Sequence, residues 1–595
     1  MGGMPTRTPQ LRRRDFLRFA AITVAVSAAP KLSGCSDASS GGVSTPEDID
    51  RVFPQGVASG DPRPDSVVLW TRVESADAEL RVAYQVALDE GFSQIVAEGE
   101  VVTGIERDGT VKLKPVGLDA FTTYFYRFTA LGVTSMVGRT KTAPAPGDDV
   151  PVRFAFASCQ DYVGRWYHAW QAFVTQGGEV DFVVHLGDYV YETSGDPDFQ
   201  TPEERRSVIL PDGLSLGESA TENLAAVTLA DYRTLYKTYR SDPWLKRAHQ
   251  LYPFVVTWDD HEFANDSWSD HATDFNEARG DEKSTSRREA ANQAFFEFQP
   301  ADVVYDESAS YPDDIRIYRS LRYGRHVDLL LIDGRLYRDD HLVPEGPVDL
   351  DVGKFSANSS LGSRNFVLKP GFDEREAAAT PSLLGAAQKA WLLDALSSSG
   401  ATWKILGSDV QLSQMLVDLR SFELLPDQFR NLFYFSVDQW DGYRSERAEI
   451  LRTVAGLDNV VALAGDIHAF YASELYENFD DQSGAPIAVE YVCAGISSSP
   501  VQEITQSTVD SNPTLSALGL GALVPQFDTI LQQASPQYRY AKSLAHGIAI
   551  MDVQRADAVE VEFLQIAAVR TPEWDGSLER VRLRTPAGSN RVERV

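Results

Sequence analysis

The sequence predicts a large α/β domain preceded by a small all-β domain. Residues 52–142 carry short β-rich runs separated by turn residues, which is typical of an all-β unit. After Pro151, continuous apolar runs alternate with longer polar or helical stretches, as expected for strands buried on both faces of a sheet. With 595 residues, of which 43% are hydrophobic and 10% aromatic, the chain can build a large core, and a disordered protein is excluded.

Charge and cysteine content exclude two further classes. The 55 basic and 86 acidic residues give a formal net charge of −31. A general nucleic-acid binder would need Lys and Arg at phosphates, so we expect no main role in nucleic-acid binding. Three cysteines, Cys35, Cys159 and Cys493, are too few for a disulfide scaffold. We expect a monomer.

Residues 1–35 are predicted to be an export signal. Basic residues precede the apolar stretch Phe19–Ala29, which is too short to span a bilayer comfortably. Arg13-Arg14-Asp15-Phe16-Leu17-Arg18 resembles a twin-arginine signal, so the twin-arginine export machinery is an expected partner and the periplasm or the exterior the expected location. Leu32-Ser33-Gly34-Cys35 resembles a lipobox, in which Cys35 would be lipidated and anchor the chain. The alternative is an ordinary secretory signal in which Cys35 is incidental. The Ser- and Gly-rich residues 36–50 are expected to form a flexible tether.

The all-β unit, residues 51–143, is predicted to be a small sandwich of the immunoglobulin or fibronectin kind. Its expected strands include Val67–Arg72, Leu80–Val86 and Thr123–Phe128, and the last alternates as a half-buried strand should. We find no chemical constellation in this unit.

The α/β unit is expected to cover residues 151–570, with 571–595 as a C-terminal tail. Helices are predicted at Ser286–Phe298 and Leu383–Ser397. The strands are predicted at six apolar runs: Val152–Ala157, Val180–Leu186, Phe254–Trp258, Val327–Ile332, Trp403–Leu406 and Val460–Ala464.

Polar residues follow each of these six strands. Because the carboxyl ends of strands in an α/β sheet share one edge, where ligands bind, the following groups are expected to converge: Cys159-Gln160; Asp188 with Tyr191; Asp259-Asp260-His261-Glu262 with Asn265 and Asp266; Asp333 with Arg335; Asp409 with Gln411; and Asp466 with His468. So many anions in one place need cations between them, which predicts a metal cluster. Thiolate and phenolate donors favour a strongly Lewis-acidic transition metal, and the additional oxygen donors favour calcium beside it.

These motifs resemble those of the calcineurin-like metallophosphoesterases. Ser-Cys-Gln, Gly-Asp-Tyr-Val-Tyr-Glu and Trp-Asp-Asp-His-Glu narrow the resemblance to the PhoD family of alkaline phosphatases, which includes phospholipase-D-like phosphodiesterases. The resemblance implies an α/β metallophosphoesterase sandwich that holds a ferric ion with calcium. By motif, Asp188 would bridge the metals. Iron would be bound by Cys159, Tyr191, Asp466 and His468, and calcium by Asn265 with Asp259 and Asp260.

The motifs leave the roles of several site residues open. The motif does not decide how metal ligation, protonation of the leaving group and structural support are divided among Asp259, Asp260 and His261. Many relatives have Asn-Asn where this chain has Asn265-Asp266, so the role of Asp266 is open. Arg335 is either a clamp on the substrate phosphate or a structural ion pair with Asp333 or Asp339.

The resemblance implies an exported, metal-dependent phosphatase. A metal-bridged hydroxide would attack phosphorus in line and release inorganic phosphate from monoesters, with small phosphate esters or phospholipids as substrates. The alternative is activity on diesters. A minor alternative is a surface binding protein without catalytic activity.

Overall fold

The computed structural model describes residues 22–25, 44–197, 200–203, 205–216, 223–272, 282–343 and 364–595. The signal with Cys35 and most of the tether therefore lie outside the described residues, apart from strand β1 (Ile22–Ala25), which pairs with β6. Among the helices described, none is both long and apolar enough to cross a bilayer.

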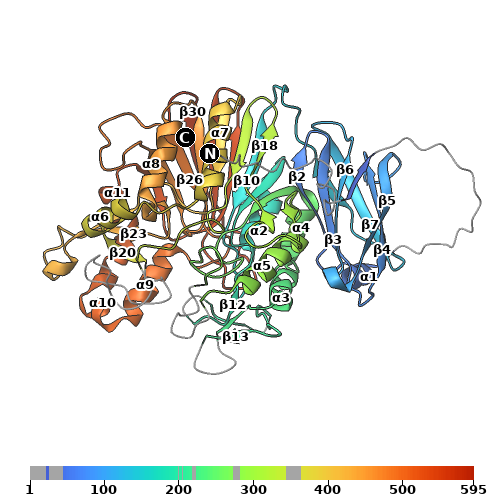
Figure 1. Ribbon diagram of the computed structural model, residues 1–595, viewed down its shortest axis with the longest axis horizontal. Helices are drawn as coiled ribbons and strands as arrows, with labels where there is room; N and C mark the ends of the chain where they lie inside the picture. The colour runs from blue at the N-terminus through green and yellow to red at the C-terminus, as the bar shows by residue number, and fades with distance from the viewer. Residues whose placement is uncertain are drawn as a thin grey trace, which may run out of the picture.

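The N-terminal domain is a two-layered β unit at one end of the molecule (Figure 1). It opens with helix α1 (Pro46–Val52), whose first turn is capped by the Thr45 side chain, so the end of the expected tether is helical. One layer holds β2 (Val57–Arg63), β3 (Ser66–Arg72) and β6 (Thr110–Val116). The other holds β4 (Leu80–Ala87), β5 (Ile95–Thr103), β7 (Thr123–Ala130), β8 (Val133–Thr134) and β9 (Gly138–Lys141). Buried Val, Leu, Tyr and Phe side chains fill the space between the layers.

This domain shares a sheet with the α/β domain. Strand β2 pairs in parallel with β15 (Pro253–Thr257), so the first β layer continues into the large sheet. At Gly60 a Cβ atom would lie 2.0 Å from the Pro300 carbonyl oxygen, so this approach of two backbones requires glycine. The Trp70 indole donates to the Glu297 carbonyl at 2.7 Å. The two units are therefore bound together by backbone pairing and packing.

Two mixed sheets form the centre of the α/β domain, which confirms the predicted sandwich. The first continues from β2 through β15, β11 (Phe182–Leu186), β10 (Val152–Ala157), β28 (His546–Val553), β29 (Ala558–Ile566), β30 (Glu579–Pro586) and β31 (Glu593–Arg594). The second runs in the order β18 (Arg319–Tyr323), β19 (Val327–Leu331), β21 (Trp403–Gly407), β24 (Val460–Ala464), β26 (Ala488–Val492), β25 (Phe470–Leu475) and β27 (Tyr538–Lys542). All six strands that the apolar runs predict are present.

The two sheets pack face to face over a dry aromatic and aliphatic core. Phe182 of the first sheet stacks on Tyr323 of the second with ring centroids 4.1 Å apart. The outer face of the first sheet is covered by α2 (His168–Gln176), α3 (Leu229–Tyr239), α4 (Pro243–Leu251) and α5 (Thr285–Phe298). The outer face of the second is covered by α7 (Gly385–Ser398) and α8 (Arg444–Val454). Helices α5 and α7 are the two that the sequence predicts.

Smaller elements surround this centre. Strands β20 (Asn365–Leu368), β22 (Leu416–Asp418) and β23 (Leu432–Ser436) form a three-stranded sheet beside α6 (Lys369–Ala379) and the helices α9 (Val501–Ser511), α10 (Pro513–Ala517) and α11 (Phe527–Ala534). The remaining short strands are β12 (Thr193–Ser194), β13 (Leu214–Ser215), β14 (Leu224–Ala225), β16 (Val304–Tyr305) and β17 (Ile315–Arg316).

The C-terminal segment differs from the tail that we expected at residues 571–595. Strand β30 pairs along its length with β29, and it buries Val581 and Leu583 while its arginines face outward. The arginine content favours a solvated tail, yet the alternation of arginine with apolar residues has the period of a strand with one buried face.

Candidate metal centre

The loops that follow the central strands turn sharply, and the turns carry the predicted ligands. Cys159, Asp188, Asp466 and His468 all have left-handed backbone, with φ of 59°, 53°, 59° and 52°. Such a conformation costs a residue other than glycine about 1–3 kcal/mol and persists only where its surroundings impose it. Its occurrence at four predicted ligands indicates that these loops are shaped to aim side chains at one point.

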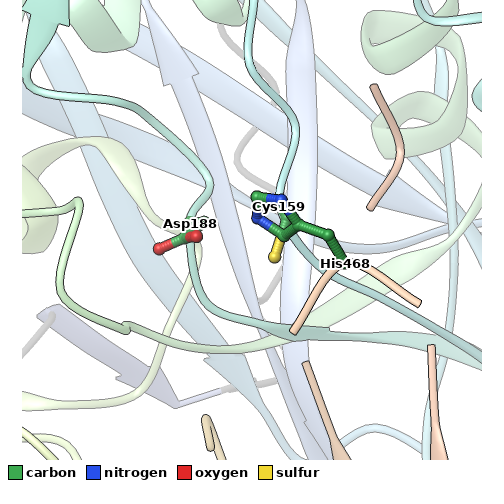
Figure 2. A group of neighbouring side chains, drawn as sticks. All are labelled: Cys159, Asp188 and His468. Atoms are coloured by element: carbon green, nitrogen blue, oxygen red, sulfur yellow. The ribbon is translucent and has the colours of Figure 1, made fainter. Parts of the chain in front are cut away.

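A first group of donors combines Cys159, Asp188 and His468. Each offers a ligand atom within 4.8 Å of the others, and Figure 2 shows the three side chains converging from separate segments of the chain. The Tyr191 phenol oxygen joins them, 3.0 Å from Asp188 Oδ2 and 3.2 Å from His468 Nε2. Four of the residues expected around iron therefore lie together.

The tautomer of His468 suits a ligand. Its Nδ1 lies 2.7 Å from the Ser499 carbonyl oxygen, which can only accept, so Nδ1 carries the hydrogen. Burial lowers the pKa of His468 to about 4, so the ring is neutral and Nε2 presents a lone pair to the group. A histidine that donates its other nitrogen to a carbonyl is the usual arrangement at protein metal sites.

A second group consists of four carboxylates, Asp188, Asp259, Asp260 and Asp466, again within 4.8 Å of one another. Burial raises the pKa of Asp188 and of Asp259 well above the usual range, and it raises the pKa of Asp466 to about 7. Within the part of the chain described, Asp188 Oδ1 and Asp259 Oδ2 are buried without a hydrogen-bond partner. Orphaned carboxylate oxygens facing one another fit bound cations, and Asp188 belongs to both groups, as a bridging ligand would.

His261 lies on the accessible side of this second group. It offers a nitrogen within 4.8 Å of Asp188 and Asp260, while its Nδ1 lies 2.6 Å from Glu192. Burial lowers the pKa of His261, but Glu192, Asp260 and Asp188 together outweigh it, so the pKa is well above its usual value. The imidazole is therefore held in a fixed orientation and favours its protonated form.

The loop after His261 carries Asn265 and Asp266, and the role of Asp266 was left open by the motif. The backbone N–H of Asn265 donates to Glu192 at 2.8 Å, which ties this loop to the one that bears Tyr191. Asp266 has left-handed backbone and groups with Asp260 and Asp438, 3.4 Å from the Arg364 guanidinium. Burial raises the pKa of Asp266 to about 8. Arg364 lowers the pKa of Asp266, but burial and the neighbouring Asp438 raise it by more.

Arg335 is fully buried beneath the carboxylates. Its Nε lies 2.5 Å from Asp259, and its terminal nitrogens lie 3.0–3.1 Å from Asp438. Asp260 and Asp466 are each 3.7 Å away. The structure therefore favours the ion-pair alternative over the phosphate clamp, with partners other than the expected Asp333 and Asp339, because Arg335 is fully buried and lies within 3.7 Å of all four carboxylates.

Glu262, Asp438 and Ser498 also belong to this centre, although none of them was assigned a role of its own from the sequence. The Glu262 carboxylate accepts the backbone N–H groups of Asp188, Tyr189 and Asp259 at 2.7–3.0 Å and so joins two ligand loops. Its place in the Asp-Asp-His-Glu motif was a usable signal. Asp438 follows the apolar strand β23, which was a signal of the same kind as the six that were used. Ser498, which contacts Tyr191, had no such signal.

Comparison with known proteins places these residues in a family context. Residues 154–563 match the PhoD-like phosphatase family, and residues 37–144 match the N-terminal domain of PhoD-like phosphatases. The chain is 34% identical over 461 residues to alkaline phosphatase D of Bacillus subtilis (strain 168), which covers 75% of this chain and 69% of the relative. The solved structure of a PhoD superposes with a TM-score of 0.71 at 28% identity and covers 92% of both chains.

Proposed function

Because the chain belongs to the PhoD-like phosphatase family and is a phosphatase, we propose that it hydrolyses phosphate monoesters at this centre and releases inorganic phosphate. The observation that carries the proposal is the convergence of thiol, phenol, imidazole and carboxylate at Cys159, Tyr191, His468 and Asp188. A purely structural site would not need four different donors that share one point.

The metals that this set fits are a ferric ion and calcium. Iron would be held by Cys159, Tyr191, His468 and the shared Asp188. The thiolate of Cys159 and the phenolate of Tyr191 suit an oxidised ion. Calcium would be held by the carboxylates of Asp259 and Asp260 with the Asn265 side chain, since calcium prefers oxygen donors. The resemblance implies iron for Asp466, but Asp466 lies within 4.8 Å of Asp259 and Asp260, so we assign it to the calcium side. When bound, the metals supply Lewis acidity, which makes water a nucleophile near neutral pH and stabilises charge on the phosphoryl group.

The residues of the chain supply orientation and a proton. His261, held by Glu192, donates a proton to the leaving alkoxide oxygen as its bond to phosphorus breaks. Glu192 keeps the ring in one orientation and stabilises its protonated form, which is restored by a proton from solvent after each turnover. Arg335 beneath the site offsets part of the negative charge of the carboxylates, which would otherwise repel a phosphate dianion.

The burial of several predicted ligands favours monoesters over diesters. Cys159, Asp188, Asp259 and Asp260 are buried. His261, Asn265, Asp466 and His468 are partly exposed, and the side chains of His261 and Asp466 are 14% and 18% exposed. A monoester places one compact, charged phosphoryl group at the metals, whereas a diester needs room there for a second alcohol.

Two measurements test this function. The first is metal content by elemental analysis, for which we expect iron and calcium in stoichiometric amounts. The second is the ratio of hydrolysis rates on p-nitrophenyl phosphate and bis-p-nitrophenyl phosphate, for which we expect a strong monoester preference. A diester preference would make this chain a phosphodiesterase with the same metals, and absence of turnover on both substrates by fully loaded protein would overturn the proposal.

The proposal includes export by the twin-arginine route, which delivers folded, metal-loaded proteins outside the cytoplasm. It rests on Arg13-Arg14 and the apolar run that follows. Replacing both arginines by lysine should retain the phosphatase in the cytoplasm, as cell fractionation would detect. Cys35→Ala should release a lipid-anchored enzyme from the membrane, and an unchanged distribution would mean that Cys35 is incidental. We further propose that the exported enzyme is a monomer, which size-exclusion chromatography with light scattering tests.

A further inference from the structure

Three consecutive serines, Ser497 to Ser499, follow strand β26, and their hydroxyl groups have no part in the reaction proposed above. Their backbone is fixed to the loop of Cys159: Gly495 bridges to Ser158, and the Ser498 N–H lies 3.3 Å from the Cys159 carbonyl oxygen. A Cβ atom on Gly495 would lie 3.1 Å from that same carbonyl oxygen, so the two segments are in close contact. The serines therefore keep a constant position relative to the metal ligands.

Each serine hydroxyl has a different partner. That of Ser497 donates to the Asp161 carbonyl at 2.6 Å, and that of Ser499 accepts from Arg165 at 2.6 Å. The hydroxyl of Ser498, which is 2% exposed, lies 2.7 Å from the Tyr191 phenol oxygen. Of the three, only Ser498 reaches a predicted ligand through its side chain.

The direction of the Ser498 hydrogen bond follows from its other contact. The Asp161 backbone N–H donates to Ser498 Oγ at 3.1 Å and so occupies one of its lone pairs. A serine hydroxyl has a single hydrogen, which is then free to point at Tyr191. Ser498 can therefore donate to the phenol oxygen whether or not Tyr191 keeps its own proton.

We propose that Ser498 is a positioning residue that acts on the metal through Tyr191. When Tyr191 is a phenolate beside Asp188 and Cys159, its oxygen is surrounded by negative charge, and the Ser498 hydroxyl is a neutral donor that holds it in place and withdraws electron density from it. The inference rests on the proposed function, because it requires Tyr191 to bind a metal. Loss of such an outer hydrogen bond typically weakens metal binding by roughly ten-fold to a hundred-fold.

The optical spectrum of the iron-loaded protein tests the electronic effect. In Ser498→Ala the phenolate loses a hydrogen-bond donor and becomes a stronger electron donor, so its charge-transfer absorption to ferric iron should move to longer wavelength. Ser498→Thr, which keeps a hydroxyl, should restore the wild-type band. Ser497→Ala, which removes the neighbouring hydroxyl that donates to the Asp161 carbonyl, is the matched control and should leave the band unmoved. A band in Ser498→Ala identical to that of the wild type would overturn the inference.

A double-mutant cycle on metal affinity tests the route of action. Retention of iron against a competing chelator should fall at least ten-fold in Ser498→Ala, but should not fall further when Tyr191→Phe is already present. An equal loss in both backgrounds would mean that Ser498 is merely structural. If the wild-type protein has no phenolate charge-transfer band, the iron assignment of the proposed function fails. The cycle, carried out with whichever metal the protein retains, then decides the role of Ser498 separately.

Discussion

Arg335 is the position where the structure makes its sharpest energetic prediction. Arg335→Met keeps the length of the side chain and removes the guanidinium that contacts Asp259, leaving this carboxylate buried with its repelling neighbours. Asp438 keeps Arg338 at 3.2 Å and His341 at 2.6 Å, so the loss falls mainly on Asp259. Breaking one side of a fully buried ion pair destabilises a protein by about 3–5 kcal/mol.

This free energy converts to a measurable shift in melting temperature. For a unit the size of residues 151–595, an unfolding entropy of about 2 cal/mol/K per residue gives roughly 1 °C for each kcal/mol. We therefore expect Arg335→Met to melt about 3–5 °C below the wild type by scanning calorimetry of chelator-treated protein. The difference should be smaller in metal-loaded protein, because the cations then offset part of the same negative charge.

Two further variants make the comparison decisive. The Arg420 side chain is 62% exposed and pairs with Asp418 at the surface. Arg420→Ala should therefore shift the melting temperature by less than about 1 °C. Arg335→Lys keeps the charge without the planar fork and should fall between the wild type and Arg335→Met. The reasoning would be refuted if Arg335→Met melted like the Arg420 variant while its KM for monoesters rose. That combination would mean that Arg335 clamps the substrate phosphate.

Three other predictions concern the site and the core beneath it. Asp188→Asn removes the charge of the shared ligand, so both iron and calcium should be lost on dialysis, as elemental analysis would detect. Turnover of p-nitrophenyl phosphate should then fall below detection. Glu192→Gln leaves the metals in place but weakens the charge support of His261, so kcat should fall roughly ten-fold to a hundred-fold, most for esters whose alcohol is a poor leaving group. His185 is buried in β11, and burial lowers its pKa to about 3. In the unfolded chain this imidazole binds a proton below about pH 6.5, whereas in the folded chain it stays neutral. The free energy of unfolding of the wild type should therefore decrease by about 1.4 kcal/mol per pH unit because of His185 as the pH falls from 6 to 4. His185→Leu should remove that slope in urea unfolding followed across the same pH range.

Each of these predictions has an outcome that contradicts it. Metal content close to wild type in Asp188→Asn would show that Asp188 is not shared between the ions. An equal loss of kcat for good and poor leaving groups in Glu192→Gln would remove proton donation by His261 from the mechanism. Parallel stability curves for His185→Leu and the wild type would mean that this imidazole is solvated in the folded state.

The strands and the order of the site residues were readable from the sequence, because both depend on local patterns. The runs Val152–Ala157 and Val460–Ala464 became β10 and β24 with the same bounds, since a strand buried on both faces is apolar along most of its length. The residues that follow them were expected to converge because the carboxyl ends of strands share one edge. Cys159, Asp188 and His468 did so.

Pairings between distant segments were decided only by the tertiary structure. The sequence left Arg335 between a clamp and an ion pair, and its actual partners, Asp259 and Asp438, lie 76 and 103 residues away. The joining of β2 to β15, the addition of β30 to the sheet and the contact of Ser498 with Tyr191 are of the same kind. A residue's own neighbours in the chain determine its secondary structure through periodicity and turn chemistry. Its hydrogen-bond and charge partners depend instead on how loops of many residues bring separate strands together, and no local pattern encodes that path.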